Sequence, residues 1–234
     1  MNILQLLSNL DDDISIRAVA THCKVLKNNN WNAYVFAPLG RELSYFKRWG
    51  AEIVSQRPSP KDIVYSKATI KELCNLVSSK SINSIHVYDL AGYKAALQVQ
   101  KTCSIKIIMS LLQNTPERGV LGRLNRTIFG EFLPQVSTLV PSKTAYNELL
   151  TKYSIKNIEL FHVPIPVDFT VYDEKKISQE RTISLATQWG MLEKPRHIIL
   201  TRAYFDSKKW QNQIIKLSVI LEKMPENIKP YLVV

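Results

Sequence analysis

The chain has 234 residues, 45% hydrophobic and 22% charged, which at about 150 residues per domain is one large domain or one domain plus part of another. Its 7 glycines and 11 prolines lie in the ordinary globular range, so collagen-like, low-complexity and disordered chains are excluded. The net charge of +11 attracts anions such as nucleic acid, phosphorylated small molecules or acidic lipid headgroups, without choosing among them.

Cysteine usage and the N-terminus point to a reducing compartment. The three cysteines, Cys23, Cys74 and Cys103, are widely spaced and form no CxxC pair, so neither a disulfide framework nor a zinc site is expected. The N-terminus lacks the basic segment and apolar run of a signal peptide, and no stretch approaches the ~20 apolar residues of a membrane span. We expect a cytoplasmic protein, with contact to a membrane surface left open.

Short apolar runs alternate with segments of helical periodicity up to about residue 168. The pattern predicts strands at residues 2–7, 33–37, 51–54, 82–87, 105–109, 136–140 and 158–163. It predicts helices at residues 14–26, 41–49, 65–77, 91–99, 117–133 and 142–152. Because strands buried on both faces need not alternate, near-continuous apolar strands separated by helices favour a doubly wound parallel α/β sheet.

A second unit is expected after residue 168. Residues 171–181 are charged and lack periodicity, which predicts a linker within 169–190. Residues 196–200 are strand-like, 209–222 have helical spacing, and 231–234 begin another strand. One such βαβ unit of roughly 40 residues is too small for a core of its own. The expected architecture is a Rossmann-like domain over 1–168 and an incomplete second Rossmann-like unit over 191–234, as in a truncated two-domain protein.

Motifs that mark a nucleotide or catalytic site directly are missing, since the sequence has no GxGxxG, GxxxxGK[ST], HExxH or GxSxG. Four weaker segments occur instead, at residues 85–89 (IHVYD), 139–150 (LVPSKTAYNELL), 163–169 (VPIPVDF) and 198–210 (IILTRAYFDSKKW). Their order resembles the family-4 retaining glycosyltransferases of the GT-B architecture, in which two Rossmann-like domains face each other across a cleft.

The resemblance implies an activity and a set of roles. Full-length relatives would transfer a hexose from a nucleotide sugar to a glycan or lipid-linked acceptor, as in making cell-envelope polysaccharide, with no metal and no cofactor besides the donor. Arg202 and Lys209 would stabilise the leaving diphosphate, because fixed cations offset the charge that develops there. His86 would be catalytic on the acceptor side, where Gln113 and Asn114 would contact the sugar.

Each of these roles has a plainer alternative. Arg202 and Lys209 are then ordinary solvated side chains of a basic chain. His86 is a hydrogen-bonded structural histidine, since a lone histidine has many uses. Asp89 is expected to cap the helix that begins near Ala91 rather than to bind a sugar hydroxyl.

The sequence also departs from the family pattern. Asp11, Asp12 and Asp13 stand where the family usually has glycines, and they would repel a diphosphate unless they serve as helix caps. Gln113 follows a strand that usually ends near a histidine. The glutamate pair that holds the donor sugar would lie beyond Val234. These departures favour an inactive chain, or a non-catalytic remnant or binding module.

The predicted helix over residues 117–133, from Glu117 to Leu133, gathers apolar residues on one arc and arginines on the opposite one. Such a helix can rest on an anionic membrane, and equally can face a core with its arginines solvated. A basic nucleic-acid-binding protein is the remaining alternative. The scattered lysines and arginines and the lack of a nucleic-acid motif argue against it, so we expect no nucleic-acid partner.

Overall fold

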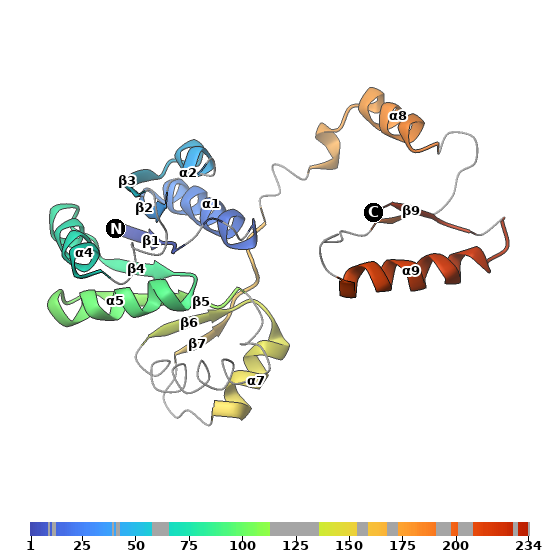
Figure 1. Ribbon diagram of the computed structural model, residues 1–234. Helices are drawn as coiled ribbons and strands as arrows, with labels where there is room; N and C mark the ends of the chain where they lie inside the picture. Colours follow the sequence, from blue (N-terminus) through green and yellow to red (C-terminus); the bar gives the residue numbers. More distant parts are fainter. Residues whose placement is uncertain are drawn as a thin grey trace. The chain divides into compact units, whose positions relative to one another are not determined.

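The computed structural model describes residues 1–8, 10, 13–38, 40, 43–57, 66–112, 136–153, 159–167, 173–190, 198–200, 208–226 and 229–233. The chain divides into two compact units, Met1–Asp168 and Phe169–Val234. The first contains a seven-stranded sheet, and the second contains a two-stranded sheet with two α-helices (Figure 1).

All seven strands of the first unit are parallel, in the order β3-β2-β1-β4-β5-β6-β7. Their bounds are β1 Asn2–Leu6, β2 Asn32–Pro38, β3 Glu52–Arg57, β4 Ser84–Val87, β5 Lys106–Ser110, β6 Ser137–Val140 and β7 Leu160–His162. The chain moves outward from β1 to β3 and then returns to place β4 on the other side of β1. This reversal is the topological switch point of a doubly wound fold. The predicted Rossmann-like α/β class is therefore confirmed.

Helices cover both faces of this sheet (Figure 1). Their bounds are α1 Asp13–Asn28, α2 Leu43–Arg48, α4 Lys67–Ser79, α5 Leu90–Thr102 and α7 Lys143–Tyr153. Strand β2 shows why its residues are apolar in a continuous run. Tyr34 and Phe36 pack into the cluster beneath α4 and α5, whereas Ala33 and Val35 pack into the cluster beneath α1 and α2. Both faces of the strand are thus core.

The turn after α2 depends on glycine. Gly50 has a φ of +87°, in the left-handed region that L side chains rarely adopt. Its N–H donates to the carbonyl of Lys47 at 3.0 Å. Strand β3 follows this turn and begins at Glu52. Gly50 thus ends this helix.

The second unit differs from the sequence prediction at its start. Instead of a loop through residue 181, the structure has the 3₁₀ turn η2 Glu174–Lys176 and the helix α8 Gln179–Gln188. Ser178 begins α8, its Oγ accepting the N–H of Arg181 at 3.2 Å. No residue of α8 is buried, and Ile183 and Leu185 are exposed. Periodicity is weak evidence for a helix that packs so little of its surface.

The rest of this unit consists of β8 Ile198–Leu200, α9 Lys208–Glu222 and β9 Tyr231–Val233, with β8 and β9 parallel. Leu221 of α9 is buried, while Ile215, Val219 and Ile220 on the same helix are exposed. Among the described helices of the chain, none has the length and hydropathy needed to cross a bilayer. The amphipathic segment predicted at 117–133 lies outside the described residues.

Asp89 joins two parts of the first unit. One carboxylate oxygen accepts the N–H of Gly92 at 2.6 Å and caps α5, as predicted from the sequence. The other oxygen accepts the N–H of Ser8, just past β1, at 3.1 Å. One side chain therefore both starts a helix and fixes the chain that leaves the neighbouring strand.

We predict that Asp89→Ala lowers the free energy of unfolding by about 1–2 kcal/mol, the usual cost of losing a helix cap. Asp89→Asn is the matched control, because its remaining carbonyl oxygen still accepts from Gly92, so its loss should be smaller. Urea unfolding followed by circular dichroism measures both. Equal midpoints for Asp89→Ala and the wild type would contradict the capping role.

Candidate functional site

The candidate site lies at the carboxyl edge of the sheet, around the switch point between β1 and β4. Ligands of open α/β sheets bind in the crevice at this edge. Here Ser8 follows β1, Tyr88 and Asp89 follow β4, and Ser110 ends β5. The parallel register aligns these strand ends, with Gln5 beside His86 and His86 beside Ile108.

Five polar side chains form a hydrogen-bonded group under helix α1, which we call the Tyr88 network: Gln5, His22, His86, Tyr88 and Ser110. The Tyr88 hydroxyl is its centre. It lies 2.5 Å from Gln5 Oε1, 2.8 Å from His22 Nδ1 and 3.0 Å from His86 Nδ1. The other ring nitrogen of His86, Nε2, lies 2.8 Å from Ser110 Oγ.

Counting protons fixes the direction of each bond in the Tyr88 network. A phenol has one proton and two lone pairs, and the Tyr88 hydroxyl donates its proton to Gln5 Oε1. Both imidazoles must then donate from Nδ1 to the same phenol oxygen. His86 Nε2 is left with a lone pair, which accepts the proton of Ser110 Oγ. The geometry therefore places a proton on Nδ1 of both histidines, and an uncharged His86 has its other nitrogen available to accept from Ser110.

Burial keeps the two histidines uncharged. Burial, and then the nearby His22, hold the pKa of His86 well below its ordinary value of 6.5. Burial lowers the pKa of His22 to about 4. Burial and then Cys23 raise the pKa of Tyr88 well above 10. At neutral pH the network thus offers oriented hydrogen bonds and no net charge.

The structure describes some of the site residues predicted from the sequence and not others. His86 lies at the switch point, 6% exposed and with both ring nitrogens bonded to protein. Gln113, Asn114 and Arg202 lie outside the described residues, as do Asp11 and Asp12. Lys209 lies in the first turn of α9, but its side chain is not described. Their predicted roles stay predictions.

Sequence reasoning missed the four other members of the Tyr88 network. Two signals were present. Gln5 is a polar residue within the apolar strand NILQL, and His86 and Tyr88 are two residues apart, so they face the same side of β4. His22 was hidden in the apolar stripe of α1, and its sequence separation from Tyr88 is 66 residues.

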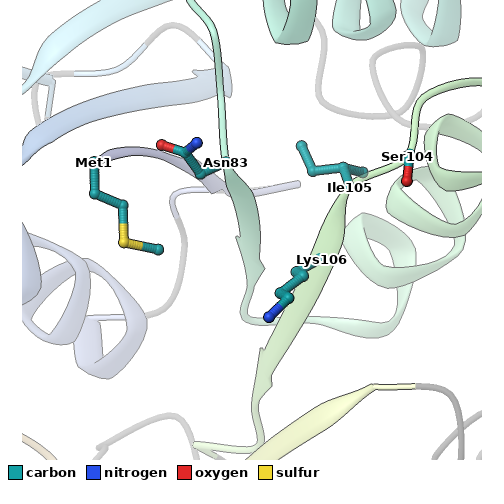
Figure 2. A pocket seen from close by; sticks show the side chains of 5 residues that line it. All are labelled: Met1, Asn83, Ser104, Ile105 and Lys106. Atoms are coloured by element: carbon teal, nitrogen blue, oxygen red, sulfur yellow. The ribbon is translucent and has the colours of Figure 1, made fainter.

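A hollow of about 690 Å³ lies at the opposite edge of the sheet, lined by Met1, Asn83, Ser104, Ile105 and Lys106 (Figure 2). These residues stand at the amino ends of β1, β4 and β5. The fold places ligands at the carboxyl edge, so this hollow is no candidate for the site. Among the described residues, no three His, Cys, Asp or Glu side chains gather as a metal site.

Solved structures supply the comparison with known proteins. A glycosyltransferase from Rickettsia africae ESF-5 matches 94% of the chain with a TM-score of 0.72 and 15% identity. Anabaena HepE, solved in complex with UDP and glucose, matches 99% with a TM-score of 0.68 and 12% identity. The chain has the fold of GT-B glycosyltransferases.

The same fold is found in Acinetobacter baumannii MurG, which matches 99% of the chain with a TM-score of 0.50 and 10% identity. The chain spans 57% of the Rickettsia protein and 60% of HepE. No protein-family model matches the sequence, and no curated protein matches it either. At these identities the comparisons establish the fold alone.

We predict that Tyr88→Phe destabilises the protein by about 3 kcal/mol, because it leaves the Gln5 oxygen and two imidazole N–H groups without their shared partner in a buried site. Tyr45→Phe is the control, since Tyr45 is 58% exposed and its change should stay within about 0.5 kcal/mol. Chemical unfolding of both variants measures the difference. Equal stabilities would show that the hydroxyl contributes little.

Stability should also fall in mild acid. Unfolded histidines take up protons near pH 6.5, whereas folded His22 does so only near its pKa of about 4. The unfolded state therefore binds more protons between these values, and the free energy of unfolding decreases as the pH falls from about 7 to 4. His22 should account for about 3 kcal/mol of this decrease. His86, whose pKa is also lowered, acts in the same direction.

Urea unfolding between pH 7.5 and 4 measures this slope. His22→Gln should flatten it, because glutamine does not titrate while the His86 contribution and those of the carboxyl groups remain. A variant as steep as the wild type would mean that His22 has the same pKa in the folded and unfolded states.

Proposed function

We propose that this chain belongs to a family-4, GT-B glycosyltransferase that moves a hexose from a nucleotide sugar to a glycan or lipid-linked acceptor. Residues 1–168 form the acceptor-side domain, 169–190 connect the halves, and 191–234 begin the nucleotide-sugar side. The observation that carries the proposal is the match of 99% of the chain to the fold of HepE, which was solved with UDP and glucose.

The donor side of the proposal rests on the order of elements around β8. Arg202 follows β8 by two residues, and Lys209 is the second residue of α9. The segment between a parallel strand and its following helix is where α/β folds bind phosphates, using the helix N-terminus together with basic side chains. Arg202 would grip two phosphate oxygens and Lys209 would add a compact positive charge. These cations would serve the leaving diphosphate without a metal.

The acceptor side of the proposal centres on the end of β5. Gln113 and Asn114 follow this strand and would hydrogen-bond the acceptor sugar. Ser110, the last residue of β5, is held by His86 Nε2. We assign His86 the acceptor side, acting through Ser110 as a positioning residue. Because its pKa is low, His86 is poorly suited to proton transfer at neutral pH. Orienting Ser110 is the role that suits it better.

The site would operate in the cytoplasm, at the surface of a membrane when the acceptor is lipid-linked. Residues 117–133 would supply the contact, their arginines facing anionic headgroups. Helix α8 buries none of its residues, and Ile215, Val219 and Ile220 of α9 are exposed, which argues that this unit needs further covering surface. We therefore expect little or no transfer by these 234 residues alone.

A non-catalytic binding module is the second candidate, favoured by the Tyr88 network. Its two histidines are uncharged and hydrogen-bonded to protein, so they are poorly suited to acid or base catalysis. Incubation with radiolabelled nucleotide sugars tests this second candidate. Release of sugar or its transfer to an acceptor would exclude a purely non-catalytic module.

We predict that the chain binds UDP-hexose weakly, and that Arg202→Ala and Lys209→Ala each reduce the affinity by about 10-fold or more, as expected for charge-assisted bonds to phosphate. Lys216→Ala is the matched control, because Lys216 is an exposed lysine on the same helix α9. Isothermal titration calorimetry at low salt measures all three. Equal losses in the three variants would mean that general positive charge, rather than a site, holds the nucleotide.

A further inference from the structure

Two of the three cysteines meet on the face of the sheet that α4 and α5 cover. Cys74 lies in α4, and Cys103 is the residue that ends α5. The two helices lie side by side (Figure 1). Both cysteines are partly buried and pack against the same hydrophobic cluster. The two side chains interact, and Cys103 contributes to raising the pKa of Cys74. Both are free thiols, as is Cys23, which lies in α1 and is fully buried on the other face of the sheet.

We propose that Cys74 and Cys103 form an oxidation site, which closes to an intramolecular disulfide when it meets a small disulfide such as oxidised glutathione. One cysteine thiolate attacks a glutathione sulfur, forming a mixed disulfide and releasing one reduced glutathione. The second cysteine thiolate then attacks the protein sulfur of that mixed disulfide and releases the second glutathione. The protein loses two electrons and two protons, and glutathione disulfide gains both.

Local geometry favours closure of this bridge. Cys74 and Cys103 pack against one cluster and their side chains interact, so closure needs them to approach to the sulfur–sulfur bond length of about 2.05 Å. Cys103 lies just beyond the helix with extended dihedral angles of φ −116° and ψ 125°. Its N–H still bonds to the carbonyl of Val99 at 2.8 Å. This bond fixes the backbone of Cys103, while the residue itself lies outside the helix.

Accessibility separates this pair from the third cysteine. Cys74 and Cys103 are both partly exposed, so a small oxidant can reach them. Burial, and then Cys103, hold the pKa of Cys74 above its ordinary value. Cys23 is inert by comparison, since burial raises the pKa of its thiol to about 12. Because the thiolate is the attacking species, bridge formation should accelerate as the pH rises.

The bridge would lie away from the candidate site. Cys103 precedes β5 at the amino edge of the sheet, whereas Asp89 caps the other end of α5 at the carboxyl edge. Closure would join α4 to α5 and leave the Tyr88 network unchanged. It would also close a chain loop of about 30 residues, which restricts the unfolded state and stabilises the fold. This inference is independent of the proposed function.

The test incubates the full chain at pH 8.5 with excess oxidised glutathione, and then blocks the remaining thiols under denaturing conditions. We expect the free thiols to fall from three to one, a mass loss of two hydrogen atoms, and a non-reducing peptide map that joins Cys74 to Cys103. We expect Tm to rise by about 5 °C, reversed by reductant. Cys74→Ser and Cys103→Ser should each abolish the bridge.

Cys23→Ala is the matched control and should retain the bridge. The wild-type peptide map identifies the joined cysteines even if that core variant folds poorly. Three unmodified thiols, stable glutathione adducts on Cys74 and Cys103, a bridge to Cys23, or a disulfide between two chains would each overturn the proposal.

Discussion

The central strands of the first unit are buried on both faces, and this constraint governs what the sheet can contain. A buried polar side chain costs free energy unless it finds a partner. Gln5 and His86 are such residues, adjacent in the register of β1 and β4. Tyr88 serves both with one hydroxyl. The network therefore allows these polar side chains to occupy the core at the switch point, because it gives them hydrogen-bond partners.

This constraint also explains the chemical state of the site. Burial removes the solvent that would stabilise an imidazolium, and the proton of Tyr88 is committed to Gln5. The two histidines consequently keep one tautomer and no charge. Such a group orients a neighbour such as Ser110 more readily than it exchanges protons with a substrate. Because the members are hydrogen-bonded to one another, the loss of any one of them leaves a buried polar group without its partner.

Local sequence patterns predicted most of the first unit because its signals are local. Apolar runs and helical spacing located the strands and helices, and Asp89 was recognised as a cap from its place before a helix. The network could not be predicted in the same way. Gln5 and Tyr88 are 83 residues apart, and only the crossover of parallel strands brings them together. The contact of Cys74 with Cys103 depends likewise on the packing of two helices.

The second unit was predicted less well for a related reason. Helix α8 buries none of its residues, so tertiary packing left little imprint on its sequence, and its start at Ser178 is marked chiefly by capping. Arg202 and Lys209 were selected by resemblance and by their order after a strand. Both side chains lie outside the part of the chain that the structure describes.

The neutral state of the Tyr88 network bears on where a diphosphate could be held. A leaving group of two phosphates needs positive charge close to it, and the described switch-point side chains supply none at neutral pH. Asp89 adds a carboxylate that is already bonded to Ser8 and Gly92. Under the proposed function the cations would therefore come from elsewhere in the chain, which carries an excess of 11 positive charges. This is why the segment between β8 and α9, with Arg202 and Lys209, carries the donor side of the proposal.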